Sequence, residues 1–435
     1  MNSNELIPIK KLFDFEKGQL QSSKNTEGQY TFITAAQEWK THESFTHDCE
    51  ALIFAAAASG SLGRTHYYNG KFIASDLCFV LTPKEKYKNL IDIKFYHTIF
   101  NSLKEDIVKQ TSTGTSKVSI NKTNFGNYEI PLFDIDHQNS IKEKLEFTQP
   151  KKSTLDEELQ TQSELINKLR SSILSDAVSG KLVPQDPNDE SAEVLLEKIK
   201  AQKEKLIQEG KIKKQKPLPP ISEDEIPYEL PNGWVWCRLD DICRYIQRGK
   251  SPKYTEKNTR IPIIAQKCVQ WKEIQMYKCQ YLDLTKFETY TKERLLRNND
   301  ILWNSTGLGT LGRVNIFQHE KKYKIVVADS HVSVIRSIKK FIDSQYIYKF
   351  LLSPFVQNEI ENKSSGSTKQ SELGLNTIKN HLVPLPPLEE QKRIVEKVEK
   401  LMATCDALEL EVQNSKAETE KLMQSVLKEA FKNGK

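Results

Sequence analysis

The chain of 435 residues repeats itself with an offset of 253 positions. The dipeptide Pro131-Leu132 recurs as Pro384-Leu385, and the repeat continues through the charged segments that follow. Further matched pairs are Gln138 and Gln391, Ile141 and Ile394, Lys144 and Lys397, Glu146 and Glu399, Leu169 and Leu422, Ser172 and Ser425, Leu174 and Leu427, and Ala177 and Ala430. A chain made of two copies of one plan can carry a pseudo-two-fold axis, and duplex DNA is the commonest two-fold object that proteins bind. The repeat therefore predicts two equivalent halves and points to double-stranded DNA as a partner.

Positive charge is concentrated in one part of the chain, whose formal net charge is +6. Residues 5–132 hold 15 basic and 14 acidic residues, a net of +1, whereas residues 232–385 hold 25 and 14, a net of +11. The remaining residues hold 24 and 30, a net of −6. A basic globular domain indicates a polyanionic partner. The charge of residues 5–132 does not indicate such a partner.

A long helix is predicted after the globular part of each copy, at 136–182 and at 387–435. Alternating steps of four and three residues from Ile141 meet seven apolar residues in eleven positions, and the same walk from Ile394 meets eight. This spacing predicts heptad seams. We expect an intramolecular antiparallel coiled coil with one domain at each end; the alternatives are helices packed on their own domains or paired between chains. Pro150 is expected to kink or break the first helix.

The globular parts, 1–135 and 232–386, contain short β-branched and aromatic strands broken by Gly, Asn and Pro, with helical stretches between them. The step Tyr68-Asn69-Gly70 predicts a hairpin turn. A connector at 183–231 holds an amphipathic helix from Ser191 to Gly210. We therefore expect an α+β protein: two mixed α/β domains, separated by two long helices and related by an internal duplication.

Two motifs recur in both globular parts. The turn Gly60-Ser61-Leu62-Gly63-Arg64 corresponds to Gly309-Thr310-Leu311-Gly312-Arg313, and TSTGTSKVS corresponds to KSSGSTKQSELG. The second pair keeps a Gly-x-x-Lys element among hydroxyl residues, which suits phosphate contact, although an ordinary surface turn is the alternative. The arginine after the glycine turn can read guanine or clamp a phosphate, or it can pair within its own domain. The predicted DNA contacts are glycine, basic and imidazole residues: Arg64, Gly114, Lys117, Lys122, Arg248, Lys250, Arg313, His331, Gly366 and Lys369.

The sequence lacks the motifs of common enzymes. The glycines near Gly307 are not followed by the lysine of a P-loop, no dinucleotide-binding glycine fingerprint opens a helix, and no Asn/Asp-Pro-Pro-Tyr motif of amino-methyltransferases is present. His42, His47, Asp48 and Cys49 fit no standard metal spacing. Seven cysteines without a CxxC pair indicate reduced thiols. We expect a cytoplasmic protein without catalytic residues, metal or membrane segment.

Three long segments resemble the specificity subunit of type I restriction-modification systems. They are LSDAVSGKLVPQDPNDESAEVLLEKIKAQ in the connector, DEIPYELPNGWVWCRLDDI at Asp224–Ile242, and PLPPLEEQKRIVEKVEKL at Pro384–Leu401. The likeness covers essentially the whole chain. Copy one departs from it at both edges, since it opens with IPIKKLFDF and has IPLFDIDHQNSI where copy two has the proline-rich segment.

The resemblance implies a non-catalytic subunit whose two target-recognition domains each read half of a gapped, asymmetric DNA site. It implies that the helices set the spacing and dock two modification subunits, which methylate adenine with S-adenosylmethionine, and that restriction subunits join with ATP and Mg. No cofactor is expected in this chain itself. Two alternatives remain: the specificity subunit of a system whose methyltransferase and nuclease are fused, and a coiled-coil scaffold that does not bind DNA.

Overall fold

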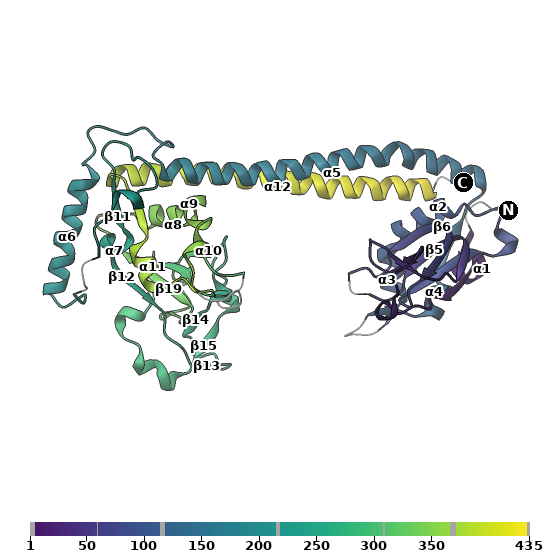
Figure 1. The fold of residues 1–435 in the computed structure, drawn as a ribbon, viewed down its shortest axis with the longest axis horizontal. Coiled ribbons are helices and arrows are strands. Elements are labelled where there is room, and N and C mark those ends of the chain that lie inside the picture. Colours follow the sequence, from purple (N-terminus) through teal and green to yellow (C-terminus); the bar gives the residue numbers. More distant parts are fainter. Residues whose placement is uncertain are drawn as a thin grey trace. The chain divides into compact units, whose positions relative to one another are not determined.

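The computed structural model describes residues 5–58, 60–113, 118–214, 218–307, 309–365 and 371–432. It divides into two compact units, of which unit 1 comprises Met1–Thr161 with Val412–Lys435 and unit 2 comprises Gln162–Glu411. Each unit holds one globular domain and a stretch of both long helices, α5 (Ile135–Val178) and α12 (Leu388–Lys432) (Figure 1). Among the described helices, none combines the length and the apolar character needed to cross a membrane.

The domain of unit 1 is built on a six-stranded sheet in the order β2-β7-β5-β6-β3-β4. Its strands are β2 (Phe13–Lys17), β3 (Tyr30–Ile33), β4 (Lys40–His42), β5 (His47–Ala55), β6 (Thr65–Ala74) and β7 (Cys78–Pro83). Around it lie the pairs β1 (Glu5–Pro8) with β10 (Glu129–Leu132) and β8 (Ser112–Thr113) with β9 (Ser119–Ile120), and the helices α1 (Ile9–Leu12), α2 (Ile93–Ser102), α3 (Lys104–Thr111) and α4 (Lys122–Asn127). Leu52 and Phe54 of β5 share one buried core with Tyr96, Ile99 and Phe100 of α2. The amphipathic spacing of α2 therefore covers one face of the sheet.

The domain of unit 2 divides the same plan into two sheets, β12-β19-β16-β17 and β13-β15-β14-β18. Their strands are β12 (Cys243–Arg248), β13 (Tyr254–Thr255), β14 (Pro262–Ile264), β15 (Gln280–Leu282), β16 (Ile301–Asn304), β17 (Val314–Ile316), β18 (Val327–Ala328) and β19 (Val332–Ser337). The pair β11 (Val235–Arg238) with β20 (Leu382–Leu385) and the helices α7 (Leu239–Ile242), α8 (Ser344–Leu352), α9 (Pro354–Gln357), α10 (Ile360–Lys363) and α11 (Leu375–Asn380) complete it. The edge pair and α8 correspond to β1–β10 and α2 of unit 1.

One strand accounts for the difference between the two domains. In unit 1, β6 runs unbroken; it pairs antiparallel with β5 from Thr65 to Phe72 and in parallel with β3 from Phe72 to Ala74. In unit 2, residues 317–326 separate β17 from β18, so the antiparallel and parallel pairings fall in different sheets. The predicted hairpin at Tyr68-Asn69-Gly70 is therefore wrong. These residues lie inside β6, because β5 extends beside them and pairs Cys49 with Gly70.

The duplication reaches individual hydrogen bonds. The buried Gln138 side chain accepts from the backbone N–H of Asp92 (2.9 Å) and donates to a carbonyl just before α5 (2.8 Å). Gln391 does the same at the start of α12, where it accepts from Asp343 N–H (2.9 Å) and donates to the preceding carbonyl at 3.0 Å. Asp92 and Asp343 are the N-caps of α2 and α8, which are equivalent helices of the two domains. Each glutamine thus fastens its long helix to its own domain.

A tyrosine repeats in the same way. Tyr96 of α2 donates its hydroxyl hydrogen to the Pro131 carbonyl (2.9 Å), and Tyr346 of α8 donates to the Pro384 carbonyl (2.6 Å). Both prolines belong to the repeat found in the sequence, so the offset of 253 residues corresponds to equivalent positions in the two domains.

The long helices are paired and antiparallel. In unit 2, Arg170 Nη2 of α5 lies 2.6 Å from Asp406 Oδ1 and 3.1 Å from Glu409 Oε2 of α12. In unit 1, Lys152 Nζ lies 3.6 Å from Glu420 Oε2. Residue numbers rise along one helix as they fall along the other, which confirms the predicted antiparallel pairing within one chain.

The seam between the helices is narrower than predicted. One position of each heptad is buried, at Leu159, Ile166 and Ile173 of α5 and at Val398, Cys405 and Val412 of α12. The other predicted seam position is exposed at Leu155, Leu169, Leu408 and Leu422. A regular two-stranded coiled coil buries both positions, so this pair leaves a row of leucines uncovered.

Helix α5 does not break at Pro150. A proline inside a helix removes one backbone hydrogen bond and costs about 3 kcal/mol. That cost falls on a single turn, whereas the rest of this helix of 44 residues keeps its regular backbone hydrogen bonds. The predicted break at Pro150 is therefore wrong, because the helix continues through this residue.

The connector contains α6 (Ala192–Gln208), close to the predicted helix. Ala192, Leu195 and Ile199 bury one face of it. Lys203 Nζ donates to the backbone carbonyl of Asp240 at the start of α7 (2.5 Å). The connector helix thus packs against the second domain.

We predict that Gln391→Ala destabilises unit 2. The substitution leaves the Asp343 N–H and a carbonyl buried without their partner, which costs roughly 1–3 kcal/mol. Chemical denaturation followed by tryptophan fluorescence measures it, because only Trp39 among the five tryptophans lies outside unit 2. The exposed Gln208 at the end of α6, also in unit 2, is the control, and equal effects of Gln391→Ala and Gln208→Ala would contradict the role given to Gln391.

Candidate nucleic-acid interface

The site in unit 2 begins where β12 ends, at Arg248. Gly249 follows, and a Cβ at this position would lie 2.2 Å from the carbonyl oxygen of Ala328 and 2.3 Å from that of Asp329. Gly249 N–H donates to the Val332 carbonyl (2.9 Å). No side chain fits at such a distance, so glycine is required for this close approach of two backbones.

The opposing turn connects β18 to β19 and is held by Asp329. Its carboxylate accepts from the backbone N–H of His331 (2.8 Å), from the Ser330 hydroxyl (3.3 Å) and from the hydroxyl of Tyr254. Burial and this hydrogen bond to a carboxylate raise the pKa of Tyr254. The aspartate is therefore occupied in shaping the turn, which presents Ser330 and His331.

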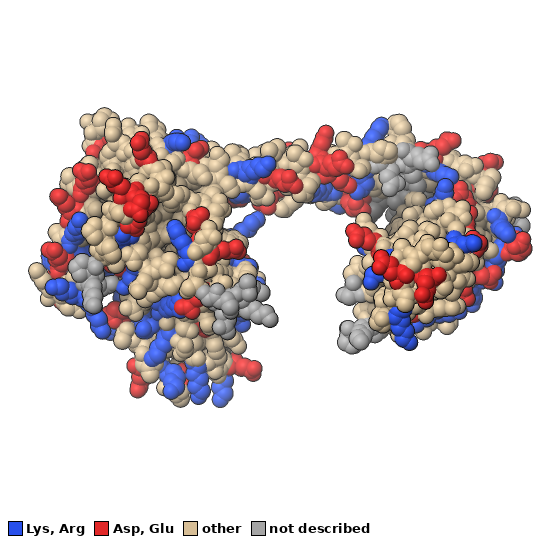
Figure 2. Space-filling model, viewed as in Figure 1, with Lys and Arg blue, Asp and Glu red and all other residues tan. Residues whose placement is uncertain are grey.

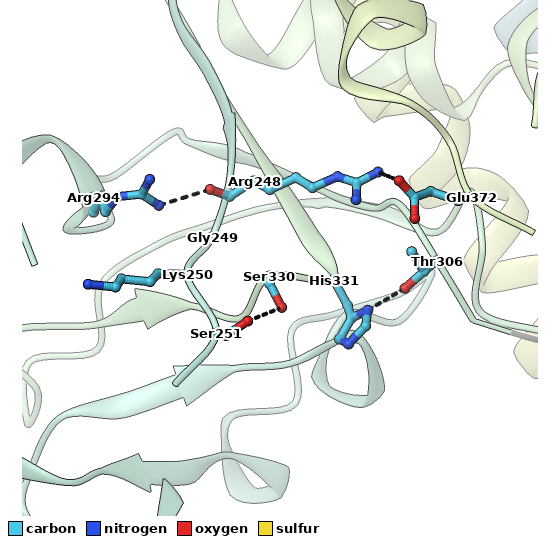
Figure 3. A pocket seen from close by; sticks show the side chains of 9 residues that line it. All are labelled: Arg248, Gly249, Lys250, Ser251, Arg294, Thr306, Ser330, His331 and Glu372. Carbon is cyan, nitrogen blue, oxygen red and sulfur yellow. Dashed lines mark hydrogen bonds and ion pairs between the residues drawn. The ribbon is translucent and has the colours of Figure 1, made fainter. Parts of the chain in front are cut away.

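Together these segments form an open pocket of about 530 Å³ (Figure 3). It is lined by Arg248, Gly249, Lys250, Ser251, Arg294, Thr306, Ser330, His331 and Glu372. Its lining contains three cationic side chains, those of Arg248, Lys250 and Arg294, and one carboxylate, that of Glu372, so the pocket is basic. Hydroxyl groups and an imidazole add further hydrogen-bond donors, and this combination suits phosphate oxygens and the acceptor edge of guanine.

The charged groups of the pocket are fixed by their neighbours. Arg248 Nη2 lies 2.7 Å from Glu372 Oε1 and donates to the Leu373 carbonyl (2.9 Å). Arg294 Nη1 donates to the Arg248 carbonyl (3.2 Å), and Lys250 Nζ donates to a backbone carbonyl at 3.0 Å. The cations are thereby ordered before any ligand binds, which lowers the entropic cost of binding.

The imidazole of His331 stands over the same pocket. Its Nδ1 lies 2.7 Å from the Thr306 hydroxyl (Figure 3). Within the described part of the chain, no residue forms a hydrogen bond to its Nε2. The exposed ring thus keeps one nitrogen for an external donor or acceptor.

Three of the ten predicted contact residues, Arg248, Lys250 and His331, meet in this pocket although His331 lies 81 to 83 positions after the others. Lys122 lies elsewhere, at the start of α4 in unit 1, with Nζ 5.5 Å from the Phe15 ring centre. Gly114, Lys117, Gly366 and Lys369 lie outside the described residues. For all of these residues, contact with DNA stays a prediction.

The two arginines after the glycine turns bind within their own domains. Arg64 Nη1 donates to the Ala35 carbonyl (3.2 Å) and the Ser61 hydroxyl (3.3 Å). Arg313 donates to the Gly309 carbonyl (2.6 Å) and to the side-chain oxygen of Gln270 (2.6 Å). The sequence left two roles open for these arginines, DNA contact and pairing within their own domain, and the structure shows the contacts within the domain.

Sequence reasoning missed Arg294 and Glu372, which modulate the charge of the pocket. Arg294 lies in a short 3-10 helix, and Glu372 faces Arg248 from a position 124 residues away. No local pattern marks either residue. Gly249, by contrast, carried a usable signal, since a glycine directly after a strand indicates a close approach of backbone.

The basic character of the second domain is visible on its surface. Figure 2 shows Lys and Arg side chains gathered over the end of the domain formed by β13 and β15. On the first domain, acidic and basic side chains are interspersed. Among the described residues, no cluster of three or more His, Cys, Asp and Glu side chains could hold a metal ion.

We predict that Gly249→Ala destabilises unit 2 by roughly 1–3 kcal/mol, because the added methyl group forces two backbones apart. Tryptophan fluorescence during chemical denaturation measures the loss. Gly374→Ala is the control, since the nearest atom to its Cβ is the Thr377 hydroxyl oxygen at 3.3 Å, which can rotate away. A fully stable Gly249→Ala protein would show that the close approach is not needed.

Comparison with known proteins connects these features to one family. A family model described as "Type I restriction modification DNA specificity domain" matches residues 1–164 and 231–416. The chain is 36% identical over 274 residues to the Type I restriction enzyme EcoAI specificity subunit of Escherichia coli, a match that covers 58% of this chain and 42% of the relative. The chain thus spans less than half the length of that relative. It is 24% identical over 434 residues to the EcoDI specificity subunit of Escherichia coli, covering 98% of this chain and 87% of the relative.

A solved structure has the same fold. It is described as "Structural basis underlying complex assembly and conformational transition of the type I R-M system", and the TM-score is 0.60 at 16% sequence identity, over 100% of this chain and 99% of the solved one. The family model covers both domains and most of the chain. The protein therefore belongs to the family of type I restriction-modification DNA specificity proteins.

Proposed function

We propose that this chain is the DNA-recognition subunit of a type I restriction-modification system and reads a bipartite, gapped, asymmetric duplex site. The target-recognition domains are residues 1–135 and 232–386. The observation that carries the proposal is the duplicated attachment of helix to domain through Gln138 and Gln391, in a chain of this family. Two readers on one antiparallel helix pair suit two separated half-sites.

The subunit is proposed to act without catalytic groups of its own and to recruit adenine methyltransferase subunits and restriction subunits. These partners supply the chemistry, with S-adenosylmethionine for methylation and ATP and Mg for restriction. The exposed leucines of the helices support docking: Leu155 and Leu422 in unit 1, and Leu165, Leu169, Leu408 and Leu410 in unit 2. Apolar rows of this kind on a helix pair suit packing against further helices.

The decisive experiment is a genome-wide map of methylated adenines in cells that express the chain with its modification partner. The proposal expects one interrupted sequence with two different halves. A continuous methylated sequence would contradict it, and an absence of both methylation and DNA binding would favour a protein scaffold. The partner that co-purifies with the chain, separate or fused to a nuclease, distinguishes the two kinds of system.

We predict that Lys250→Ala weakens binding of the assembled complex to cognate and unrelated duplexes alike. Loss of one phosphate contact lowers the slope of the logarithm of the binding constant against the logarithm of salt concentration by about one unit. Glu372→Gln should strengthen binding, because it removes the carboxylate of the pocket. Fluorescence anisotropy across a salt series measures both. Lys340, exposed outside the pocket, is the control, and equal behaviour of Lys250→Ala and Lys340→Ala would rule out the contact.

We predict that the helices set the gap between the half-sites. Deleting residues 157–163 and 410–416, which are 253 positions apart, removes seven residues from each helix and keeps the heptad register. The deletion shortens the pair by ~10 Å, or about three base pairs. The methylation map should then contain both original halves with a shorter gap. An unchanged gap in a folded, active variant would mean that another element sets the distance.

A further inference from the structure

The first domain repeats the backbone frame that supports the pocket of the second. Strand β2 ends at Lys17, and Gly18 follows, where a Cβ would lie 2.2 Å from the Ser75 carbonyl oxygen and 2.6 Å from that of Ala74. The contacts at Gly249 are equivalent in kind and distance. In both domains, then, a glycine directly after an edge strand lies against the end of an opposing strand.

The hydrogen bonds around the two glycines agree as well. Four backbone bonds of the first domain have counterparts in the second: Gly18 N to Cys78 O (2.9 Å) with Gly249 N to Val332 O (2.9 Å), Gln19 N to Ala74 O (3.1 Å) with Lys250 N to Ala328 O (3.1 Å), Ser75 N to Ile33 O (2.9 Å) with Asp329 N to Ile264 O (3.0 Å), and Ala56 N to Leu77 O (2.9 Å) with Ser305 N to His331 O (2.9 Å). The correspondence assigns the positions of Asp76 and Leu77 to those of Ser330 and His331.

The side chains on this shared frame differ in chemistry. The half-buried Asp76 stands where the second domain has Ser330, and Leu77 stands where it has His331. Leu77 is 38% exposed, although a leucine normally gains free energy from burial. A domain with a net charge of +1 thus presents a carboxylate and an exposed apolar side chain at the position where the basic domain presents a hydroxyl and an imidazole.

We propose that the turn Asp76-Leu77, flanked by Lys17 and Gln19, is the base-reading site of the first domain on duplex DNA. The inference rests on the proposed function and deepens it, since it names the residues that make the first half-site differ from the second.

The chemistry of the turn suits base edges and not the phosphate backbone. Phosphates repel a carboxylate, whereas the amino group of cytosine in the major groove donates to one. An exposed leucine packs against the methyl group of thymine. Lys17 and Gln19 supply a cation and an amide at the side of the turn, where they can hold a phosphate or the edge of an adenine. The first domain therefore needs little net positive charge.

The test exchanges the two turns in the full chain assembled with its modification partner. We expect the double variant Asp76→Ser, Leu77→His to change or relax one half of the methylated sequence and to leave the other half intact. The reciprocal variant Ser330→Asp, His331→Leu should alter the other half alone. For either variant, anisotropy should show that affinity for the original duplex falls relative to affinity for unrelated duplexes by roughly tenfold or more, because a lost base contact of this kind is worth about that factor.

Leu90→His is the matched control, because Leu90 is 37% exposed in the same domain and lies outside the turn. The assembly that contains Leu90→His should methylate the original sequence. Leu77→Ala provides a milder variant if the double variant does not fold, and it should relax one position of one half-site. A folded Asp76→Ser, Leu77→His or Leu77→Ala assembly with an unchanged methylated sequence overturns the inference. A wild-type assembly that methylates no interrupted sequence overturns the proposed function itself, and this inference with it.

Discussion

The architecture depends on a buried glutamine in the first turn of each long helix. Gln138 and Gln391 are 0% exposed, and each bridges the backbone before its helix to the N–H of an N-capping aspartate in the domain. A side-chain amide can donate and accept at the same time, which allows one residue to satisfy two buried backbone groups. Leaving either group unsatisfied is costly. The direction in which each helix departs from its domain is therefore fixed by one amide, and the same amide is used twice.

The sequence allowed much of this architecture to be predicted, because the relevant signals were periodic or duplicated. Apolar residues at heptad spacing predicted the two helices, and the offset of 253 residues predicted the equivalence of the domains and, with it, the antiparallel pairing of the helices. Predictions from single residues were weaker. Pro150 does not end α5, since one lost hydrogen bond does not outweigh a long paired helix, and Tyr68-Asn69-Gly70 does not turn, since β5 offers a full set of partners.

The candidate site was less predictable for a physical reason. Its residues come from segments that only the folded sheet brings together, and Arg294 and Glu372 have no neighbours in sequence that mark them. Arg64 and Arg313 follow similar turns, and the sequence left two roles open for them, DNA contact or pairing within the domain; in the structure each donates to a carbonyl group inside its domain. An arginine that is repeated in both domains can serve the stability of each domain as well as the binding of a ligand. Burial and hydrogen-bond geometry decide between the two, and neither can be read from spacing.

The glycines after β2 and β12 have a consequence for how such a protein can change. Gly18 and Gly249 hold two backbones together without contributing a side chain, so the close approach in each frame is made by main-chain atoms. The exposed side chains on the opposing turns, Leu77 and His331, can therefore change at little cost to that approach, and selection acts on them chiefly through the ligand. Such a frame separates the evolution of stability from the evolution of recognition. Two copies in one chain can then diverge independently, and each new pair of domains would define a new combined target.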